Sequence, residues 1–343
     1  MATTLNNDFI LFSTGQTIGA SSSATMKNRI INGGMVIDQR NNGASVTPVN
    51  GQYLVDRWVA YLTQTSKFTA QQNAGPVTPP AGFTNYLGIT SLSAYSVLST
   101  DQFQIGQAIE GFNFSDLAWG TANAKTVTLS FWVYSSLTGA FGGSIRNDST
   151  NRSYCFSYTI SSANTWTQIS VTIAGDTSGT WLTNNGRGFL IVWGLGSGST
   201  LTTTAGSWQT GNFVQPTGSV SVVGTSGATF YLTGVQLEVG TVASSFDYRD
   251  YGRELILCQR YYEYGNFRID GYGSSSVRLS TTYGYKVNKR INPTVTFTGT
   301  GFINGSGAGI DGASDVYGFI GYFSVTSTGG AAMATGWNSS AEL

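Results

Sequence analysis

The chain has 343 residues with 17 basic and 17 acidic side chains, so its formal net charge is zero and only 10% of its residues are charged. Without a basic surplus, nucleic acid is not an expected partner. The sequence contains no histidine, which excludes Ser-His-Asp and Cys-His nucleophile systems, histidine-ligated zinc and histidine pH switches.

The N-terminal segment, residues 1–27, ends in the small polar stretch GASSSATMK. We expect it to be an anchoring arm, although the same composition also fits a disordered tail. It has neither a basic leader nor an unbroken apolar run, so we expect no signal peptide and no membrane insertion. We therefore expect synthesis in a cytoplasm.

Strand patterns dominate residues 28–248. One face of the segment KTVTLSFWVY is fully apolar, and its members are Val127, Leu129, Phe131 and Val133. The segment TWTQISVTI repeats this period of two, which is typical of a half-buried antiparallel strand. Such strands, separated by Gly, Ser and Asn turns, predict a β-sandwich.

A later strand segment, ATFYLTGVQLEV, changes the parity of its apolar residues at Gly234. A β-bulge at this glycine would restore the buried face. No charged residue occurs between residues 188 and 237. Because open edges of such strands aggregate, we expect them to be covered by a partner sheet or by neighbouring subunits.

Residues 249–265 differ from the rest of the chain, since six of the fifteen residues from Arg249 to Glu263 are charged. Spacings of four, three and four residues predict a linking helix that ends at Gly265. Its docking stripe would consist of Tyr251, Leu255, Cys258 and Tyr262. A helix of about three turns is marginal alone, so this stripe needs a surface to dock on.

Strand-like segments return in residues 266–343, in RINPTVTFTG and DVYGFIGYFSVTS. A chain of this length exceeds the usual size of one domain. We therefore expect a small C-terminal β domain after the helix. The basic cluster KVNKR, residues 286–290, is expected at a solvated strand edge.

Three stretches, in this order, carry a family resemblance: GDTSGTW (Gly175 to Trp181), TGVQLEVG (Thr233 to Gly240) and ELILCQRYY (Glu254 to Tyr262). Between Asn28 and Tyr262 the chain resembles a module common in tail and fibre proteins of tailed bacteriophages. That module is similar to the jelly rolls of carbohydrate-binding modules. The resemblance implies an all-β fold with a jelly-roll β-sandwich, a short linking helix and a small C-terminal β domain.

The resemblance further implies a structural virion protein, displayed outward as a homotrimer, assembled in the host cytoplasm and able to contact host-surface polysaccharide. The arm would attach it to other virion proteins. It implies a tail fibre or tail-associated protein rather than an enzyme. The alternatives are a capsid-attached head fibre or decoration protein and, from another class, a capsular polysaccharide depolymerase.

Related jelly rolls often carry an acidic pair in the last strand that contributes to a structural calcium site. This chain has Thr233 and Gly234 at the corresponding positions. Because calcium prefers oxygen ligands that include carboxylates, we expect no metal site and no cofactor. The two cysteines, Cys155 and Cys258, are interpreted as buried free thiols, with a single disulfide as the alternative.

Sugar recognition uses aromatic faces helped by polar side chains. Tyr86, Trp119 and Trp208 lie in turn-like surroundings and are the candidate carbohydrate-binding residues; the alternative for each is a place in the core or at a subunit contact. Glycoside hydrolysis would need two carboxylates flanking the bond, and Glu110 and Asp116 are the available pair. Turn carboxylates are the simpler explanation, so we expect no catalytic residues.

Overall fold

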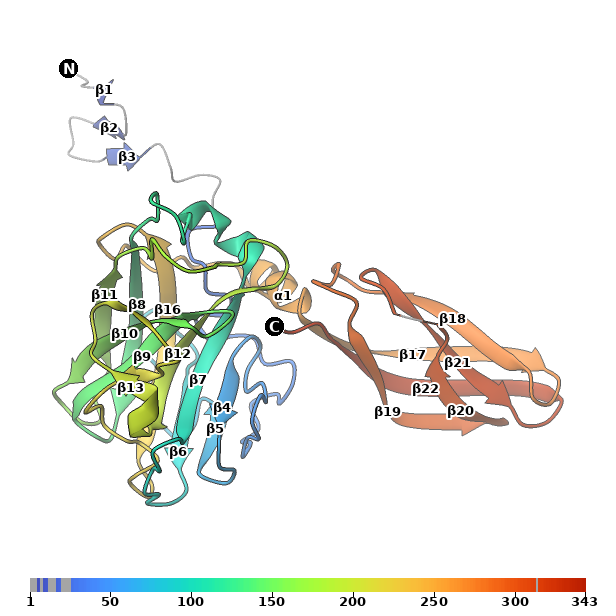
Figure 1. The fold of residues 1–343 in the computed structure, drawn as a ribbon. Coiled ribbons are helices and arrows are strands. Elements are labelled where there is room, and N and C mark those ends of the chain that lie inside the picture. Colours follow the sequence, from blue (N-terminus) through green and yellow to red (C-terminus); the bar gives the residue numbers. More distant parts are fainter. Residues whose placement is uncertain (1–4, 7–8, 12–16, 20–25, 313) are drawn as a thin grey trace.

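The computed structural model describes residues 5–6, 9–11, 17–19, 26–312 and 314–343. The predicted anchoring arm of residues 1–27 lies mostly outside the described residues. Its described pieces form an antiparallel sheet of β1 (Leu5–Asn6), β2 (Phe9–Leu11) and β3 (Thr17–Gly19) (Figure 1). No helix in the described ranges is long and apolar enough to span a membrane.

The next part of the chain is a sandwich of two antiparallel sheets (Figure 1). One sheet has the order β14 (Trp208–Thr210), β10 (Arg152–Ile160), β9 (Gly139–Asn147), β12 (Arg187–Ser197), β7 (Gln102–Glu110) and β4 (Val59–Leu62). The other has the order β11 (Thr167–Ile173), β8 (Val127–Ser135), β16 (Thr229–Val239), β6 (Leu87–Ser91) and β5 (Phe68–Gln72). Because the chain passes repeatedly from one sheet to the other, the sandwich is a jelly roll.

The core of the jelly roll lies between these two sheets. The predicted apolar face of β8 is buried there, together with Trp58 and Trp193, whose ring centroids are 5.6 Å apart. The predicted bulge is confirmed, because the register between β16 and β8 shifts between Thr233 and Gln236. Gly234 has φ of +60°, and a Cβ atom there would lie 2.6 Å from the ring of Phe83. Only glycine fits this position without strain.

The outer face of the six-stranded sheet is covered by the chain itself. The short helix η3 (Ser199–Leu201) leads into β13 (Thr202–Thr203), which pairs in parallel with β15 (Gln215–Pro216). This covering segment buries an apolar cluster that consists of Ala108, Leu190, Val192 and Val214. Within the uncharged stretch of residues 188–237, β12 and β16 are interior strands of their sheets, so the expectation that these strands are covered is confirmed for them. The short strand β14 of the same stretch lies at a sheet edge.

Arg146 is the one charged side chain of β9, and it is buried on the outer face of that sheet. Its guanidinium donates to Oε1 of Gln104 and to Oδ1 of Asn212, each at 2.7 Å. Burial lowers the pKa of Arg146 to about 10. The hydrogen bonds of this buried guanidinium are therefore accepted by neutral amide oxygens, whereas most buried arginines pair with a carboxylate.

The C-terminal module consists of two three-stranded antiparallel sheets and projects away from the jelly roll (Figure 1). The first has the order β17 (Tyr262–Gly273), β22 (Gly329–Ser340) and β19 (Thr294–Ile303). The second has the order β18 (Arg278–Gly284), β21 (Gly318–Val325) and β20 (Gly305–Ile310). Its own core includes Phe267, Phe323, Met333 and Trp337. The predicted fold class is thus confirmed.

The linking helix is shorter than the predicted span of residues 249–265. Helix α1 (Tyr251–Gln259) begins after Asp250, whose carboxylate accepts from the Arg253 N–H at 3.0 Å. The predicted stop, Gly265, lies inside β17 instead, where a Cβ atom would lie 2.9–3.0 Å from the ring of Trp337. The chain therefore changes from helix to strand within two residues.

The predicted docking stripe is wrong at both ends. Tyr251 is 63% exposed, and Tyr262 belongs to β17 rather than to the helix. Cys258 is buried, and Leu255 is partly buried in the same cluster. The aromatic residue that is buried with them is Tyr261, not Tyr251 or Tyr262. Because α1 ends at Gln259, the helical spacing cannot be continued to Tyr262, and the turn that follows brings Tyr261 inward.

Ion pairs join the two modules. Glu342 accepts from Nη2 of Arg40 at 2.7 Å and from Nη1 of Arg57, whose side chain is 1% exposed. Glu110 of β7 accepts from Arg260 at 2.5 Å. Burial favours the neutral form of Arg57, but Glu342, Tyr261, Tyr53 and Cys258 together outweigh this and hold the pKa of Arg57 above its ordinary value.

A further buried pair lies inside the C-terminal module beside the junction. Lys289 Nζ is 2.5 Å from Oε2 of Glu263, and neither side chain is exposed. The guanidinium of Arg290 reaches back to the jelly roll, where it donates to the carbonyl oxygen of Asn185 at 2.6 Å. The expectation of a solvated basic cluster at residues 286–290 is therefore wrong for Lys289 and Arg290. Lys289 pairs with a buried carboxylate and Arg290 donates to a backbone carbonyl oxygen. The spacing of residues in the sequence does not predict these partners.

The first prediction concerns Glu342. Glu342→Gln leaves the buried guanidinium of Arg57 without its counter-charge, so we expect a loss of about 3–5 kcal/mol in the free energy of unfolding. Chemical denaturation of the full chain measures this. Arg253→Ala is the control, since this helix residue is exposed, and it should change stability by less than about 0.5 kcal/mol. Equal stability of the two variants would contradict the role given to Glu342.

The second prediction concerns pH. Burial raises the pKa of the Asp56 carboxyl to about 6, against hydrogen bonds from Gln39 that lower it. The pKa in the unfolded chain is about 3.9, so the folded state holds the proton more tightly and gains stability as the pH falls. We expect the Asp56 contribution to make the protein about 1 kcal/mol more stable at pH 5 than at pH 7.

Denaturation curves of the wild-type chain and of Asp56→Asn at both pH values isolate this contribution. The variant should lack that part of the pH dependence, whatever its absolute stability. If both proteins change by the same amount between pH 7 and pH 5, Asp56 is not the group responsible.

Candidate functional site

The three predicted sugar-binding aromatics do not form a common surface. Tyr86 is 0% exposed, and its hydroxyl donates to the Ala74 carbonyl oxygen at 2.5 Å. Trp119 is 4% exposed, and its indole N–H donates to the Lys125 carbonyl oxygen at 2.8 Å. Since a sugar needs an open aromatic face, this burial contradicts the prediction for both residues.

Trp208 is half-buried in the edge strand β14. Its ring packs against those of Trp119, Tyr154 and Trp181, each with centroids 5.3 Å apart. Its indole N–H donates to the Ala174 carbonyl oxygen at 2.7 Å. These contacts place Trp208 in an aromatic cluster of the jelly roll, and its role in sugar binding stays a prediction.

The two candidate catalytic carboxylates are each held by cations of their own. Glu110 is buried and accepts from Nε of Arg260 at 2.9 Å and from the hydroxyl of Tyr261 at 2.6 Å. Asp116 lies in the short helix η2 (Ser115–Leu117) and pairs with Arg29 at 2.7 Å. They therefore tie parts of the jelly roll and the junction together.

The side chains that could bind a metal ion do not cluster in the described ranges. They contain no group of three or more Cys, Asp or Glu side chains that could hold a metal ion. Thr233 is buried, and its hydroxyl donates to the Asn85 carbonyl oxygen at 2.6 Å.

Cys155 and Cys258 are free and buried. Burial raises the pKa of Cys155 to about 12 and that of Cys258 well above its ordinary value, so both stay protonated thiols.

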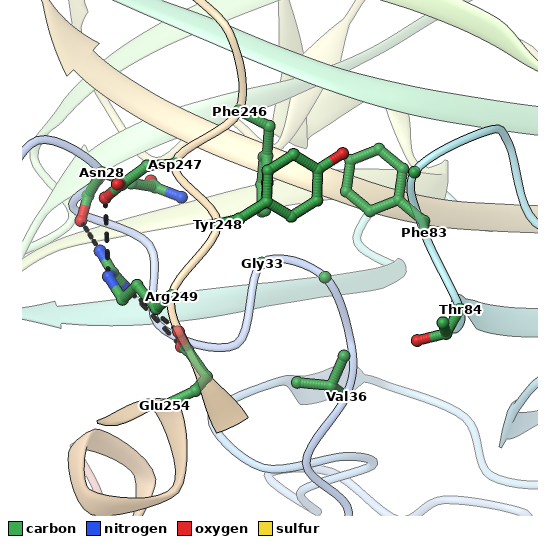
Figure 2. Close-up of a pocket in the computed structure, with 12 residues that line it drawn as sticks. Asn28, Gly33, Val36, Phe83, Thr84, Phe246, Asp247, Tyr248, Arg249 and Glu254 are labelled. Atoms are coloured by element: carbon green, nitrogen blue, oxygen red, sulfur yellow. Dashed lines mark hydrogen bonds and ion pairs between the residues drawn. The ribbon is translucent and has the colours of Figure 1, made fainter. Parts of the chain in front are cut away.

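A pocket of about 240 Å³ lies where the loop after β16 meets the start of α1. Three aromatic side chains form one wall, as Figure 2 shows. The ring of Phe83 lies 5.0 Å from that of Phe246 and 5.6 Å from that of Tyr248. Tyr248 is 61% exposed. In this aromatic pocket, the ring of Tyr248 is therefore open to solvent beside a concave space.

Two glycines shape the aromatic pocket. Gly82 has φ of +90°, and a Cβ atom there would lie 2.4 Å from the hydroxyl oxygen of Tyr248. A Cβ atom at Gly33 would lie 2.2 Å from the Val235 carbonyl oxygen, so the loop of residues 28–36 lies directly on β16. Both positions need glycine for close approach, and both line the pocket.

The opposite side of the aromatic pocket is polar (Figure 2). Arg249 donates to the carbonyl oxygens of Asn28 and Ile30 and pairs with Glu254 at 3.3 Å. Asp247 approaches Arg249 only to 3.7 Å and keeps 32% of its side chain exposed. The carboxylate of Asp247 and the exposed hydroxyl of Thr84 are thus available to a ligand. Aromatic faces with a few fixed polar groups are the usual composition of a small-molecule site.

Sequence reasoning missed the aromatic pocket. Its signal is the segment FDYRD, residues 246–250, in which two aromatics and three charged residues follow the last strand of the jelly roll. Phe83 comes from a loop more than 160 positions earlier in the chain, and no local pattern marks it as their partner. Only the fold brings these segments together.

No protein-family model matches the chain, and no curated protein matches it. Among solved structures, the enzymatically active domain of tailspike protein 4 of bacteriophage CBA120 is similar, with 12% identity and a TM-score of 0.34, covering 62% of this chain and 21% of that one. TmCBM61 in complex with β-1,4-galactotriose shows 8% identity and a TM-score of 0.31, covering 62% of this chain and 99% of that one.

A family 11 carbohydrate-binding module of a cellulosomal cellulase of Clostridium thermocellum shows 10% identity and a TM-score of 0.28 over 58% of this chain and 99% of that one. The match spans about a fifth of the tailspike chain. At these identities and TM-scores, none of the likenesses extends to a ligand or an activity.

The third prediction tests the geometry of the aromatic pocket. Gly82→Ala should push the ring of Tyr248 out of its place and change the ring-proton shifts of Phe83 and Phe246 in NMR spectra. Gly227→Ala is the matched control, because Gly227 also has positive φ, +73°, but a Cβ atom there meets nothing within 4 Å. Both variants should lose about 1–2 kcal/mol of stability through backbone strain. Unchanged shifts in Gly82→Ala would contradict the contact with Tyr248.

Proposed function

We propose that this protein is a structural fibre protein of a tailed bacteriophage, a tail fibre or tail-associated protein, that adheres to host-surface glycans without turning them over. The glycan-binding part is carried by one observation. Tyr248, 61% exposed, stands over a concave pocket beside the accessible carboxylate of Asp247. An aromatic ring takes the C–H face of a sugar, and a carboxylate accepts from its hydroxyls.

The phage assignment is supported by the sequence resemblance between Asn28 and Tyr262 and is compatible with a C-terminal module that extends away from the jelly roll (Figure 1). We further propose a homotrimer in the virion, attached to other virion proteins through residues 1–27. The aromatic pocket has a volume of about 240 Å³, so we expect it to take one or two sugar rings with low affinity. In a trimer, later contacts form at high effective concentration, which turns weak binding into useful adhesion.

Binding without catalysis is supported by the state of the two candidate carboxylates. Glu110 is buried under Arg260 and Tyr261, and Asp116 is paired with Arg29. A glycosidase needs one carboxyl group that is free to donate a proton and a second that faces the same bond. Neither condition is met by a carboxylate that is committed to a structural cation.

The fourth prediction tests the aromatic pocket as the glycan site. On an array of immobilised bacterial-surface oligosaccharides, the full chain should bind a subset of glycans. Tyr248→Ala should weaken this binding at least tenfold, because it removes the exposed ring. Tyr251→Ala is the matched control, since Tyr251 is equally exposed, at 63%, but does not line the pocket. Equal loss in both variants would point to a different surface.

Incubation of the same glycans with the protein tests the absence of turnover. We expect no release of reducing ends beyond that of a protein-free control. Release that is abolished by Glu110→Gln or Asp116→Asn would overturn the non-enzymatic part of the proposal and favour a depolymerase. Labelling of intact particles at the C-terminal module would show whether tail or capsid carries the protein.

A further inference from the structure

A second hollow, of about 450 Å³, lies between the jelly roll and the C-terminal module. Both modules line this interdomain cleft, and its residues are Arg40, Asn41, Gly51, Gln52, Tyr53, Tyr262, Asn338 and Ser340. It shares no residue with the aromatic pocket. Clefts between domains are a preferred place for ligand sites, and this one is lined mainly by polar and aromatic side chains.

Arg40 is fixed in the interdomain cleft by groups from both modules. The central carbon of its guanidinium lies 3.7 Å from the ring centroid of Tyr262 and 4.7 Å from that of Tyr53. Its Nη2 donates to Glu342 at 2.7 Å, and its buried Nε has no partner within the described part of the chain. A planar cation is thus held against two rings with part of its donor capacity unused.

Apart from Asn41, whose amide nitrogen already donates to the Leu54 carbonyl oxygen, the other polar side chains of the interdomain cleft offer donors as well. Oε1 of Gln52 accepts from the Val49 N–H at 3.0 Å, and Oδ1 of Asn338 accepts from the Thr296 hydroxyl at 2.9 Å. The amide nitrogens of Gln52 and Asn338 donate to no described residue, and neither does the hydroxyl of Ser340. Burial raises the pKa of Tyr262, so its hydroxyl stays a neutral donor. The cleft therefore offers many donors and few acceptors.

We propose that the interdomain cleft is a second binding site, specific for a sugar that carries a carboxylate, such as a hexuronic acid. The carboxylate would accept from the amide nitrogens of Gln52 and Asn338 in the field of Arg40. Because the Arg40 guanidinium already lies over one face of each ring, the C–H groups of the sugar would contact the remaining surface of the Tyr262 or Tyr53 ring. Because one amide comes from each module, the site exists only when the modules are docked.

This site is independent of the aromatic pocket, so it goes beyond the proposed function and can be tested apart from it. The probe is D-galacturonate, titrated into the ¹⁵N-labelled full chain, with D-galactose as the neutral control. We expect galacturonate to bind at least tenfold more tightly than galactose and to shift the side-chain amide signals of Gln52 and Asn338. Equal binding of the two sugars would overturn the proposal.

Variants separate this site from other surfaces. Gln52→Ala combined with Asn338→Ala should abolish the preference for galacturonate. The matched control combines Gln64→Ala with Asn266→Ala, which removes an exposed amide from each module outside the cleft, and it should keep that preference. Tyr248→Ala should keep it too. Retention of the preference in the cleft variant, or its loss in Tyr248→Ala, would contradict the proposed site.

Discussion

The Glu342 carboxylate, held between Arg40 and Arg57, is the contact on which the arrangement of the two modules depends. Only 10% of the residues of this chain are charged, and many of them meet at this junction. A buried guanidinium such as that of Arg57 is costly unless a carboxylate compensates it. Removing one partner of such a pair is therefore costly, because the other charge stays buried without compensation.

The junction also accounts for the places of the two concave sites. The aromatic pocket lies at the start of α1, where Arg249 and Glu254 hold the loop after β16 against residues 28–30. The interdomain cleft lies at the other end of the junction, beside Arg40 and Tyr262. Charged side chains thus join the elements beside both hollows.

Local patterns in the sequence predicted the elements well. The alternation at Val127 to Val133 predicted β8, and the change of parity at Gly234 predicted the bulge, because strand period and glycine geometry are local properties. The helix was predicted in place, but the predicted span of residues 249–265 was too long, and Tyr251 and Tyr262 of the predicted stripe were wrong.

The candidate site was not predictable in the same way. Tyr86 and Trp119 lie in turn-like sequence but are buried. The local sequence of such aromatic residues does not distinguish a buried ring from an exposed one. The pairs Arg57–Glu342 and Glu110–Arg260 join residues 285 and 150 positions apart. The topology of the fold brings such distant residues together. Composition and local spacing therefore do not predict which of them pair.

The pairing of Tyr262 with Ser340 places the near ends of β17 and β22 side by side at the junction. A pull on the distal turns of the C-terminal module would load these two strands together. β17 passes the force through the chain into α1, whereas β22 passes it through the Ala341 N–H to the Tyr261 carbonyl oxygen and through Glu342 to Arg57. The C-terminal module is thus joined to the jelly roll by two mechanical connections in parallel, one covalent and one electrostatic. Because Arg57 and Glu342 are buried, salt screens the electrostatic connection only weakly.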